Sequence, residues 1–269
     1  MEAVLLALGG LAAGAFGAAL GLGGGILLVP MLTLAFSLPL PAAAGTSLVS
    51  VIATSTGAAA HNVTARRADV RLGITLATGT VIGAAIGGLL AGVLPERALA
   101  GLFSALLAYT AVTMGRALVG GRPSVENEPL VNPAAPDGPD APAYRGHRLP
   151  LALAGSLAAG NVSGLLGVGG GVVTVPLVHL VQRAPLHVAV ATSNFMIGIT
   201  AAAGAYAYLF RGDVDPAVAG PVVLGVAAGA AIGARLLGRL RATWLRLLFV
   251  AVLAYTAIQM GLRALEAGA

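Results

Sequence analysis

The sequence GAALGLGGGILLVPMLTL at residues 17–34 recurs as SGLLGVGGGVVTVPLVHL at residues 163–180, at a constant offset of 146 residues. Each copy places a cluster of glycines between two apolar stretches. In a membrane protein such a cluster interrupts a helix and leaves backbone groups free to meet a solute. We therefore expect two glycine-broken helices, one in each half of the chain.

The composition indicates a membrane protein. Of the 269 residues, 58 % are hydrophobic and 9 % are charged, whereas a soluble domain carries about 25 % charged residues. Uncharged stretches at 3–37, 42–65 and 72–95 are long enough to cross a hydrocarbon core of about 30 Å. Too little polar sequence remains to cover the surface of a soluble all-helical protein. We predict an all-α, polytopic transmembrane protein.

The charged residues and motifs exclude several classes of function. Every basic residue is an arginine, the net charge is +5, and there is no cysteine. The arginines stand at the ends of apolar segments, so membrane orientation explains them better than nucleic-acid binding does. Without lysine there is no GxxxxGK loop, and neither GxSxG nor HExxH occurs. We expect no enzyme activity, no cofactor, no metal and no nucleic-acid partner.

The repeat extends far beyond the glycines. At the same offset, Asp69 matches Asp215, and Ala108-Tyr109-Thr110-Ala111 matches Ala254-Tyr255-Thr256-Ala257. The chain therefore consists of two homologous transmembrane repeats, 1–118 and 147–269. The stretch between them, 119–146, is rich in Pro, Asp and Asn and predicts a disordered cytoplasmic linker.

Each repeat contains five apolar segments. In the first repeat they cover residues 3–21, 25–37, 42–61, 71–94 and 97–118. The second segment has only 13 residues, which is short for a full crossing. The first two segments therefore form either one broken span or a hairpin that returns to its starting side.

The arginine distribution favours the hairpin, because cytoplasmic loops are enriched in Lys and Arg. A hairpin puts 12 of the 15 arginines on one side and leaves Arg97, Arg211 and Arg263 on the other. A broken span divides the arginines 9 to 6. With the hairpin each repeat crosses an odd number of times, so we predict two inverted-topology repeats with both termini outside. This architecture is typical of secondary transporters with a site near the middle of the membrane.

The glycine clusters suit an anion. The helix after each cluster is expected to begin near Ile26 or Leu27 in the first repeat and near Val172 in the second. Its first amide groups have no partner inside the helix. Such amides favour negative charge without a buried cation. The alternative is that the glycines only let helices cross closely. The candidate glycines are Gly21, Gly23, Gly24 and Gly25 with Gly167, Gly169, Gly170 and Gly171.

Two further pairs of glycines have small-xxx-small spacing, Gly83 with Gly87 and Gly229 with Gly233. Small residues at this spacing let the backbones of membrane helices approach each other closely. For these four glycines we favour helix packing over a role in binding.

Hydroxyl and amide side chains near the clusters can donate hydrogen bonds to oxyanion oxygens. The alternative is that they cap helices or bond to their own backbone. Asn161 and Ser163 stand where the first repeat has Ala15 and Gly17, so they either tune the pocket or join two helices. The candidates for the substrate site are Thr46, Ser47, Asn161, Thr192, Ser193 and Asn194.

His61 ends the third segment and is the candidate for proton coupling, because histidine exchanges a proton near neutral pH. The alternative, which we favour, is an interfacial residue with no special role, and its counterpart is Ala207. No carboxylate lies within a predicted span, which argues against a relay of buried acids and weakens a cation carrier.

The duplicated G-x-G-G-G-x-x-x-V-P motif, each copy followed by a proline-bounded loop and Thr-Ser, resembles the TauE/SafE family of sulfite exporter-like permeases. His61 followed by Arg66 and Arg67 is similar to the family pattern, and the second repeat departs from it with Ala207. The resemblance implies a multi-pass permease of a prokaryotic inner membrane. It implies transport of sulfite, a sulfonate or thiosulfate, coupled to an ion gradient.

Only the resemblance implies that the substrate contains sulfur, whereas the helix starts predict that it is negatively charged. The partners expected are the lipid bilayer, a small sulfur-containing anion and a coupling proton or Na⁺, with a homodimer left open. The alternatives to a secondary transporter are a passive anion channel, a membrane-embedded enzyme or accessory subunit, and a cation or amino-acid carrier.

Overall fold

The computed structural model describes residues 2–20, 24–119, 144, 148–236 and 242–266, and all regular elements within these residues are helical. They are α1 (Glu2–Leu20), α2 (Gly25–Ala35), α3 (Leu40–Thr64), α4 (Val70–Leu90), α5 (Glu96–Val119), α6 (Leu149–Leu166), α7 (Gly171–Pro176), the π-helix η2 (Leu177–Val181), α8 (Leu186–Arg211), α9 (Pro216–Leu236) and α10 (Ala242–Glu266). Seven of the described helices are long and apolar enough to cross a membrane. The prediction of an all-α polytopic protein is confirmed.

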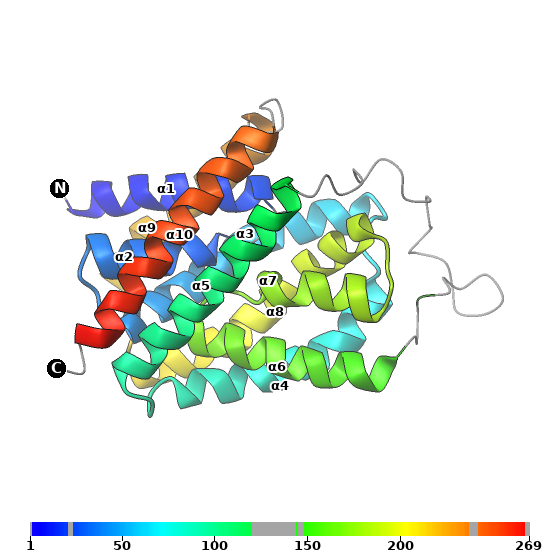
Figure 1. Cartoon of the computed structure of the whole chain (residues 1–269), viewed down its shortest axis with the longest axis horizontal. Helices are drawn as coiled ribbons and strands as arrows, with labels where there is room; N and C mark the ends of the chain where they lie inside the picture. Colours follow the sequence, from blue (N-terminus) through cyan, green and yellow to red (C-terminus); the bar gives the residue numbers. More distant parts are fainter. Residues whose placement is uncertain (1, 21–23, 120–143, 145–147, 237–241, 267–269) are drawn as a thin grey trace.

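The helices pair across the two halves of the chain. Helix α1 packs on α9 and α6 packs on α4, while α3 packs on α8 and α5 on α10. In Figure 1, α4 and α6 run together along the lower edge. The first helix of each repeat thus lies against the fourth helix of the other repeat. This exchange is what a pseudo-two-fold axis between two similar units produces.

Glycines fix the register of both exchanged pairs. A Cβ atom at Gly83 would overlap the carbonyl oxygen of Leu157, and one at Gly229 would overlap that of Leu11. These two contacts are equivalent, because both residues of one are offset by 146 from those of the other. Gly87 against Asn161 and Gly233 against Ala15 repeat the relationship one turn later. The prediction of helix packing for these glycines is confirmed.

The first two segments of each repeat form a hairpin. Gly24 lies beside Ala13, while Met31 contacts Gly9, so α2 runs back along α1. In the second repeat, Leu177 of η2 packs against Gly155 of α6 in the same way. This is the returning pair that the arginine distribution favours over one broken span.

The ends of the helices separate along the long axis of the molecule. In Figure 1 the start of α1 and the end of α10 lie at the left end of this axis, and the start of α6 lies at the right end. The predicted disorder of residues 119–146 lies almost wholly outside the described residues. One described residue of that stretch, Tyr144, is buried, and its hydroxyl donates to Oδ2 of Asp69 at 3.0 Å. Asp69 in turn caps α4 by accepting from the Leu72 amide.

Candidate functional site

The two glycine turns meet in the interior of the protein. A Cβ atom at Gly25 would lie 2.9 Å from the carbonyl oxygen of Val168 and 3.0 Å from that of Gly167. The start of α2 therefore touches the turn that precedes α7, and both are buried. Gly21 and Gly23 lie outside the described residues.

The described turns need glycine for their backbone conformation as well as for space. The φ angles of Gly24, Gly167, Gly169 and Gly170 are 76°, 74°, 80° and 81°. Residues with a Cβ atom rarely adopt this left-handed region, whereas glycine enters it without steric cost. The sequence prediction that the clusters interrupt the helices is confirmed at these four positions.

Ser47 of α3 joins the two turns. Its hydroxyl donates to the carbonyl oxygen of Gly167 at 2.7 Å and lies 3.3 Å from the carbonyl oxygen of Gly25. One turn later on α3, the Val51 side chain packs against Gly25 and Gly169. Ile197, the counterpart of Val51 on α8, also contacts Gly169. The junction of the turns therefore lies where α3 and α8 pack together.

Both interrupted helices start without a side-chain cap. The N-cap of α2 is Gly24, whose carbonyl accepts from the amides of Leu27 and Leu28 at 3.1 and 3.2 Å. The N-cap of α7 is Gly170, which likewise has no side-chain cap. The first amides of each helix have no helical partner, so backbone donors are concentrated where the turns meet. The helices begin at Gly25 and Gly171, one or two residues before the predicted starts.

The other candidate residues from the sequence have different surroundings in the structure. The Thr192 hydroxyl accepts from the Asp69 amide at 2.9 Å, so it holds the connection between α3 and α4. Thr46 is buried in α3, Asn194 is half-buried in α8, and the backbone of Asn161 packs against Gly87.

His61 is exposed near the end of α3. It lies ten residues beyond Val51, roughly 15 Å along the helix at about 1.5 Å per residue. The structure therefore does not bring His61 to the junction of the turns.

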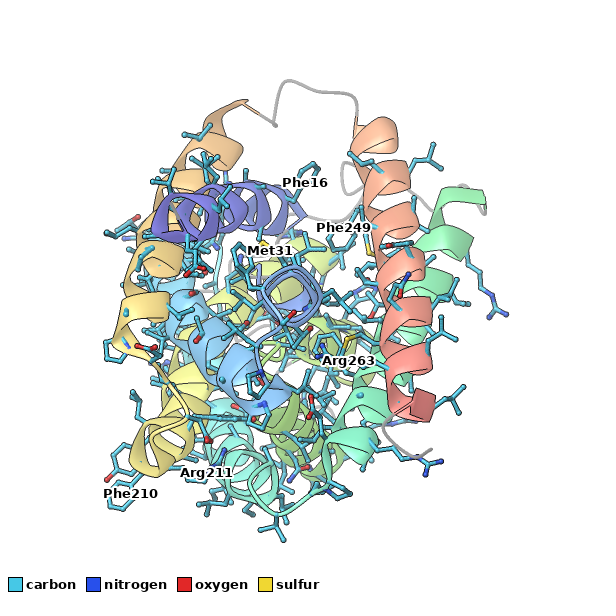
Figure 2. The ribbon with its side chains drawn as sticks, turned by 90° about the vertical axis from the view of Figure 1, so that its left-hand side faces the viewer. Phe16, Met31, Phe210, Arg211, Phe249 and Arg263 are labelled. Atoms are coloured by element: carbon cyan, nitrogen blue, oxygen red, sulfur yellow. The ribbon has the colours of Figure 1, made fainter. Side chains whose placement is uncertain are left out.

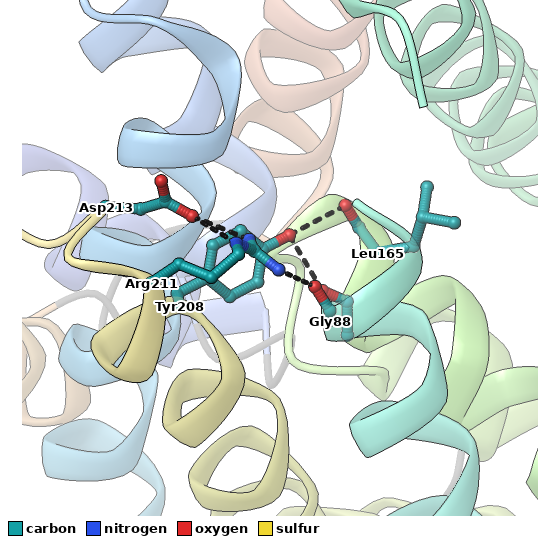
Figure 3. A network of polar contacts seen from close by, with 6 residues as sticks. Gly88, Leu165, Tyr208, Arg211 and Asp213 are labelled. Carbon is teal, nitrogen blue, oxygen red and sulfur yellow. Dashed lines mark hydrogen bonds and ion pairs between the residues drawn. The ribbon is translucent and has the colours of Figure 1, made fainter. Parts of the chain in front are cut away.

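One polar network had no clear signal in the sequence. The guanidinium of Arg211 stacks over the Tyr208 ring at 4.6 Å from its centroid and pairs with Asp213 at 2.6 Å. Its Nη1 donates to the Gly88 carbonyl near the end of α4. The buried Tyr208 hydroxyl donates to the carbonyl of Leu165 at 3.0 Å, just before the second glycine turn (Figure 3). The network thus ties the end of α8 to both α4 and α6.

Arg263, on α10 of the second repeat, makes a similar contact with the first repeat. Its side chain lies on the inner side of α10 (Figure 2), and its Nη1 donates to the carbonyl oxygen of Thr33 at 2.8 Å, within the last turn of α2. A cation is favourable at a helix C-terminus, where carbonyl groups lack partners. Two of the three arginines expected outside the cytoplasm, Arg211 and Arg263, thus bind carbonyls near helix ends. Sequence alone shows their position in the chain but not these distant partners.

Comparison with known proteins agrees with this architecture. The family model described as sulfite exporter TauE/SafE matches residues 6–260. The chain is 29 % identical over 244 residues to the probable membrane transporter protein YunE of Bacillus subtilis (strain 168), covering 87 % of this chain and 88 % of the relative. No solved structure matches. The match over nearly the whole length shows that this chain belongs to the sulfite exporter TauE/SafE family.

Proposed function

We propose that this membrane transporter carries a small sulfur-containing oxyanion, namely sulfite, a sulfonate or thiosulfate, by alternating access. The observation that carries the proposal is the contact between Gly25 and the second glycine turn at Gly167 and Val168, inside a polytopic protein. Uncapped helix starts and backbone donors at such a contact favour an anion. The description of the matching family supports sulfite as one member of the substrate class.

The residues around the junction favour an anion over a cation. Among the described residues, the one buried carboxylate is Asp69, which caps α4 and already bonds Tyr144. A cation carrier uses acidic side chains or a set of free carbonyls, and here the Gly167 carbonyl accepts from Ser47. Neutral donors can hold an oxyanion without the cost of a buried arginine.

We infer an inverted relationship between the two repeats, with the chain in the plasma membrane of a prokaryote. Three observations support it: the exchanged packing of α1 on α9 and α6 on α4, the hairpins, and the placement of the start of α6 opposite the start of α1 and the end of α10. In this arrangement, rocking one repeat against the other exposes the junction to each side in turn.

Flux into proteoliposomes tests the proposal. The purified protein is reconstituted, and uptake of radiolabelled sulfite, thiosulfate and methanesulfonate is followed under an imposed proton or Na⁺ gradient. We expect saturable uptake of at least one of these anions, with counterflow, which a passive channel does not show. Gly25→Val, which places a side chain against the Val168 carbonyl, should abolish uptake, whereas Gly101→Val, where a Cβ meets nothing within 4 Å, should not. Absence of gradient-dependent flux of every anion contradicts the proposal.

A further inference from the structure

We propose that the oxyanion binds on one side of the junction, where the hydroxyls of Ser163 and Ser193 hold it beside the second glycine turn. Ser47, by contrast, stabilises the fold and does not contact the substrate. This inference rests on the proposed function and names the side chains that contact the substrate. It begins from two hydroxyl groups that the fold buries and leaves unused.

Ser163 on α6 and Ser193 on α8 are 1 % and 0 % exposed, and their Oγ atoms have no hydrogen-bond partner among the described residues. Most buried hydroxyls in proteins are hydrogen-bonded, because an unpaired one loses its bonds to water without replacement. Two such groups are therefore donors that a bound oxyanion can use.

Both side chains belong to the surroundings of the second turn. A Cβ atom at Gly170 would lie 3.3 Å from the Oγ of Ser163, so this hydroxyl lies directly against the turn. Ser193 is one helical turn before Ile197, whose side chain contacts Gly169, and α8 packs against α7. Ser163 thus contacts the turn from α6, and Ser193 lies on α8, the helix that packs against α7.

The first repeat does not offer the same donors. Ser47 is the counterpart of Ser193, but its hydroxyl already donates a hydrogen bond to the carbonyl oxygen of Gly167 at 2.7 Å. The counterpart of Ser163 is Gly17, which has no hydroxyl. The difference between the repeats therefore concentrates unused donors at the second turn.

The chemistry of the two groups fits an oxyanion. Each serine supplies one O–H donor, and sulfite and sulfonates carry three oxygens that accept hydrogen bonds. Two neutral donors orient two of these oxygens without placing a cation in the membrane. The third oxygen remains for a backbone amide or water.

The test compares Ser163→Ala and Ser193→Ala with Ser47→Ala in purified protein. Equilibrium binding of sulfite and methanesulfonate is measured by calorimetry, and Tm is measured for each variant without ligand. We expect Ser163→Ala and Ser193→Ala to weaken binding at least fivefold with Tm unchanged or raised. Ser193→Thr, which keeps the hydroxyl, should retain binding. Ser47→Ala should lower Tm.

Three results overturn the inference and can be told apart. Unchanged affinity in both Ser163→Ala and Ser193→Ala, when the wild-type protein binds, removes these serines from the site. A lower Tm in these two variants shows that their hydroxyls are structural. Binding of neither anion by the folded wild-type protein contradicts the proposed function itself, and the serine assignment falls with it.

Discussion

The hydroxyl of Ser47 donates a hydrogen bond to the carbonyl oxygen of Gly167 at 2.7 Å, and so connects the two repeats at the point where their interrupted helices meet. The bond lies between residues that are far apart in the chain, and Ser47 is fully buried. Since no water reaches the bond in this buried position, the Gly167 carbonyl depends on this donor. The junction is therefore held by a side chain as well as by close backbone contact.

Ser47→Ala should lower the free energy of unfolding by about 1–3 kcal/mol, because it leaves a buried carbonyl without its donor. Unfolding in detergent, followed by circular dichroism with added denaturant, measures the change. Thr56→Ala is the matched control, since the Thr56 hydroxyl is exposed and bonds only the Ile52 carbonyl of its own helix. Equal stability of Ser47→Ala and the control would show that the bond contributes little.

Gly83→Ala and Gly229→Ala should each destabilise the protein by about 1–3 kcal/mol or more, since overpacking of a tight helix contact forces the helices apart. Both new methyl groups would overlap a carbonyl oxygen of the facing helix. The control is Gly101→Ala, where the methyl group meets nothing within 4 Å. Thermal unfolding of the three variants measures the effect. Because the two contacts are equivalent, a large loss in one variant with none in the other would contradict the symmetry of the packing.

Arg211→Lys should weaken the attachment of α8 to α4, because an ammonium cannot pair with Asp213, stack on Tyr208 and reach the Gly88 carbonyl at the same time. We expect a loss of about 1 kcal/mol or more, measured as a fall in Tm. Arg97→Lys, at an exposed position, is the control and should leave Tm unchanged. A Tm of Arg211→Lys equal to that of wild type would show that the guanidinium geometry is dispensable.

Arg263→Gln should loosen the end of α2, because the Thr33 carbonyl loses its cationic donor from α10. The expected result is faster hydrogen exchange of amides in the last turn of α2, with little change in α3. Arg97→Gln removes an exposed arginine from α5 and serves as the control. Exchange in α2 that is as slow in Arg263→Gln as in the control would mean that other contacts hold this helix.

The uncharged apolar segments and the glycine clusters were sufficient to predict the helices. The segment predicted over 42–61 is α3, Leu40–Thr64, and the segment predicted over 25–37 is α2, Gly25–Ala35. Length, the absence of charge and glycine interruptions are local properties, so sequence contains them. The offset of 146 also shows which glycines have equivalent partners, once one contact is known.

The polar contacts could not be predicted in the same way, because they depend on tertiary neighbours. Thr46-Ser47 and Thr192-Ser193 are identical dipeptides at equivalent positions. Yet Ser47 bonds a glycine turn, while Ser193 finds no partner among the described residues. Thr192 accepts from the Asp69 amide, a contact between residues of different repeats. Identical residues therefore acquire different roles when their tertiary contacts differ.

The inverted arrangement predicts that equivalent residues face opposite sides of the membrane, and the chain is suited to a direct test because it contains no cysteine. Arg71 and Ala217 are exposed counterparts, near the starts of α4 and α9. In intact cells, a membrane-impermeant maleimide should label Ala217→Cys and should label Arg71→Cys only after the membrane is opened, because arginine-rich loops stay in the cytoplasm. Glu96 begins α5, just beyond the end of α4 that lies opposite Arg71. Glu96→Cys should therefore be labelled like Ala217→Cys. Labelling of Arg71→Cys and Ala217→Cys from the same side would instead require parallel repeats, and rocking of the halves would then no longer exchange access to the glycine junction.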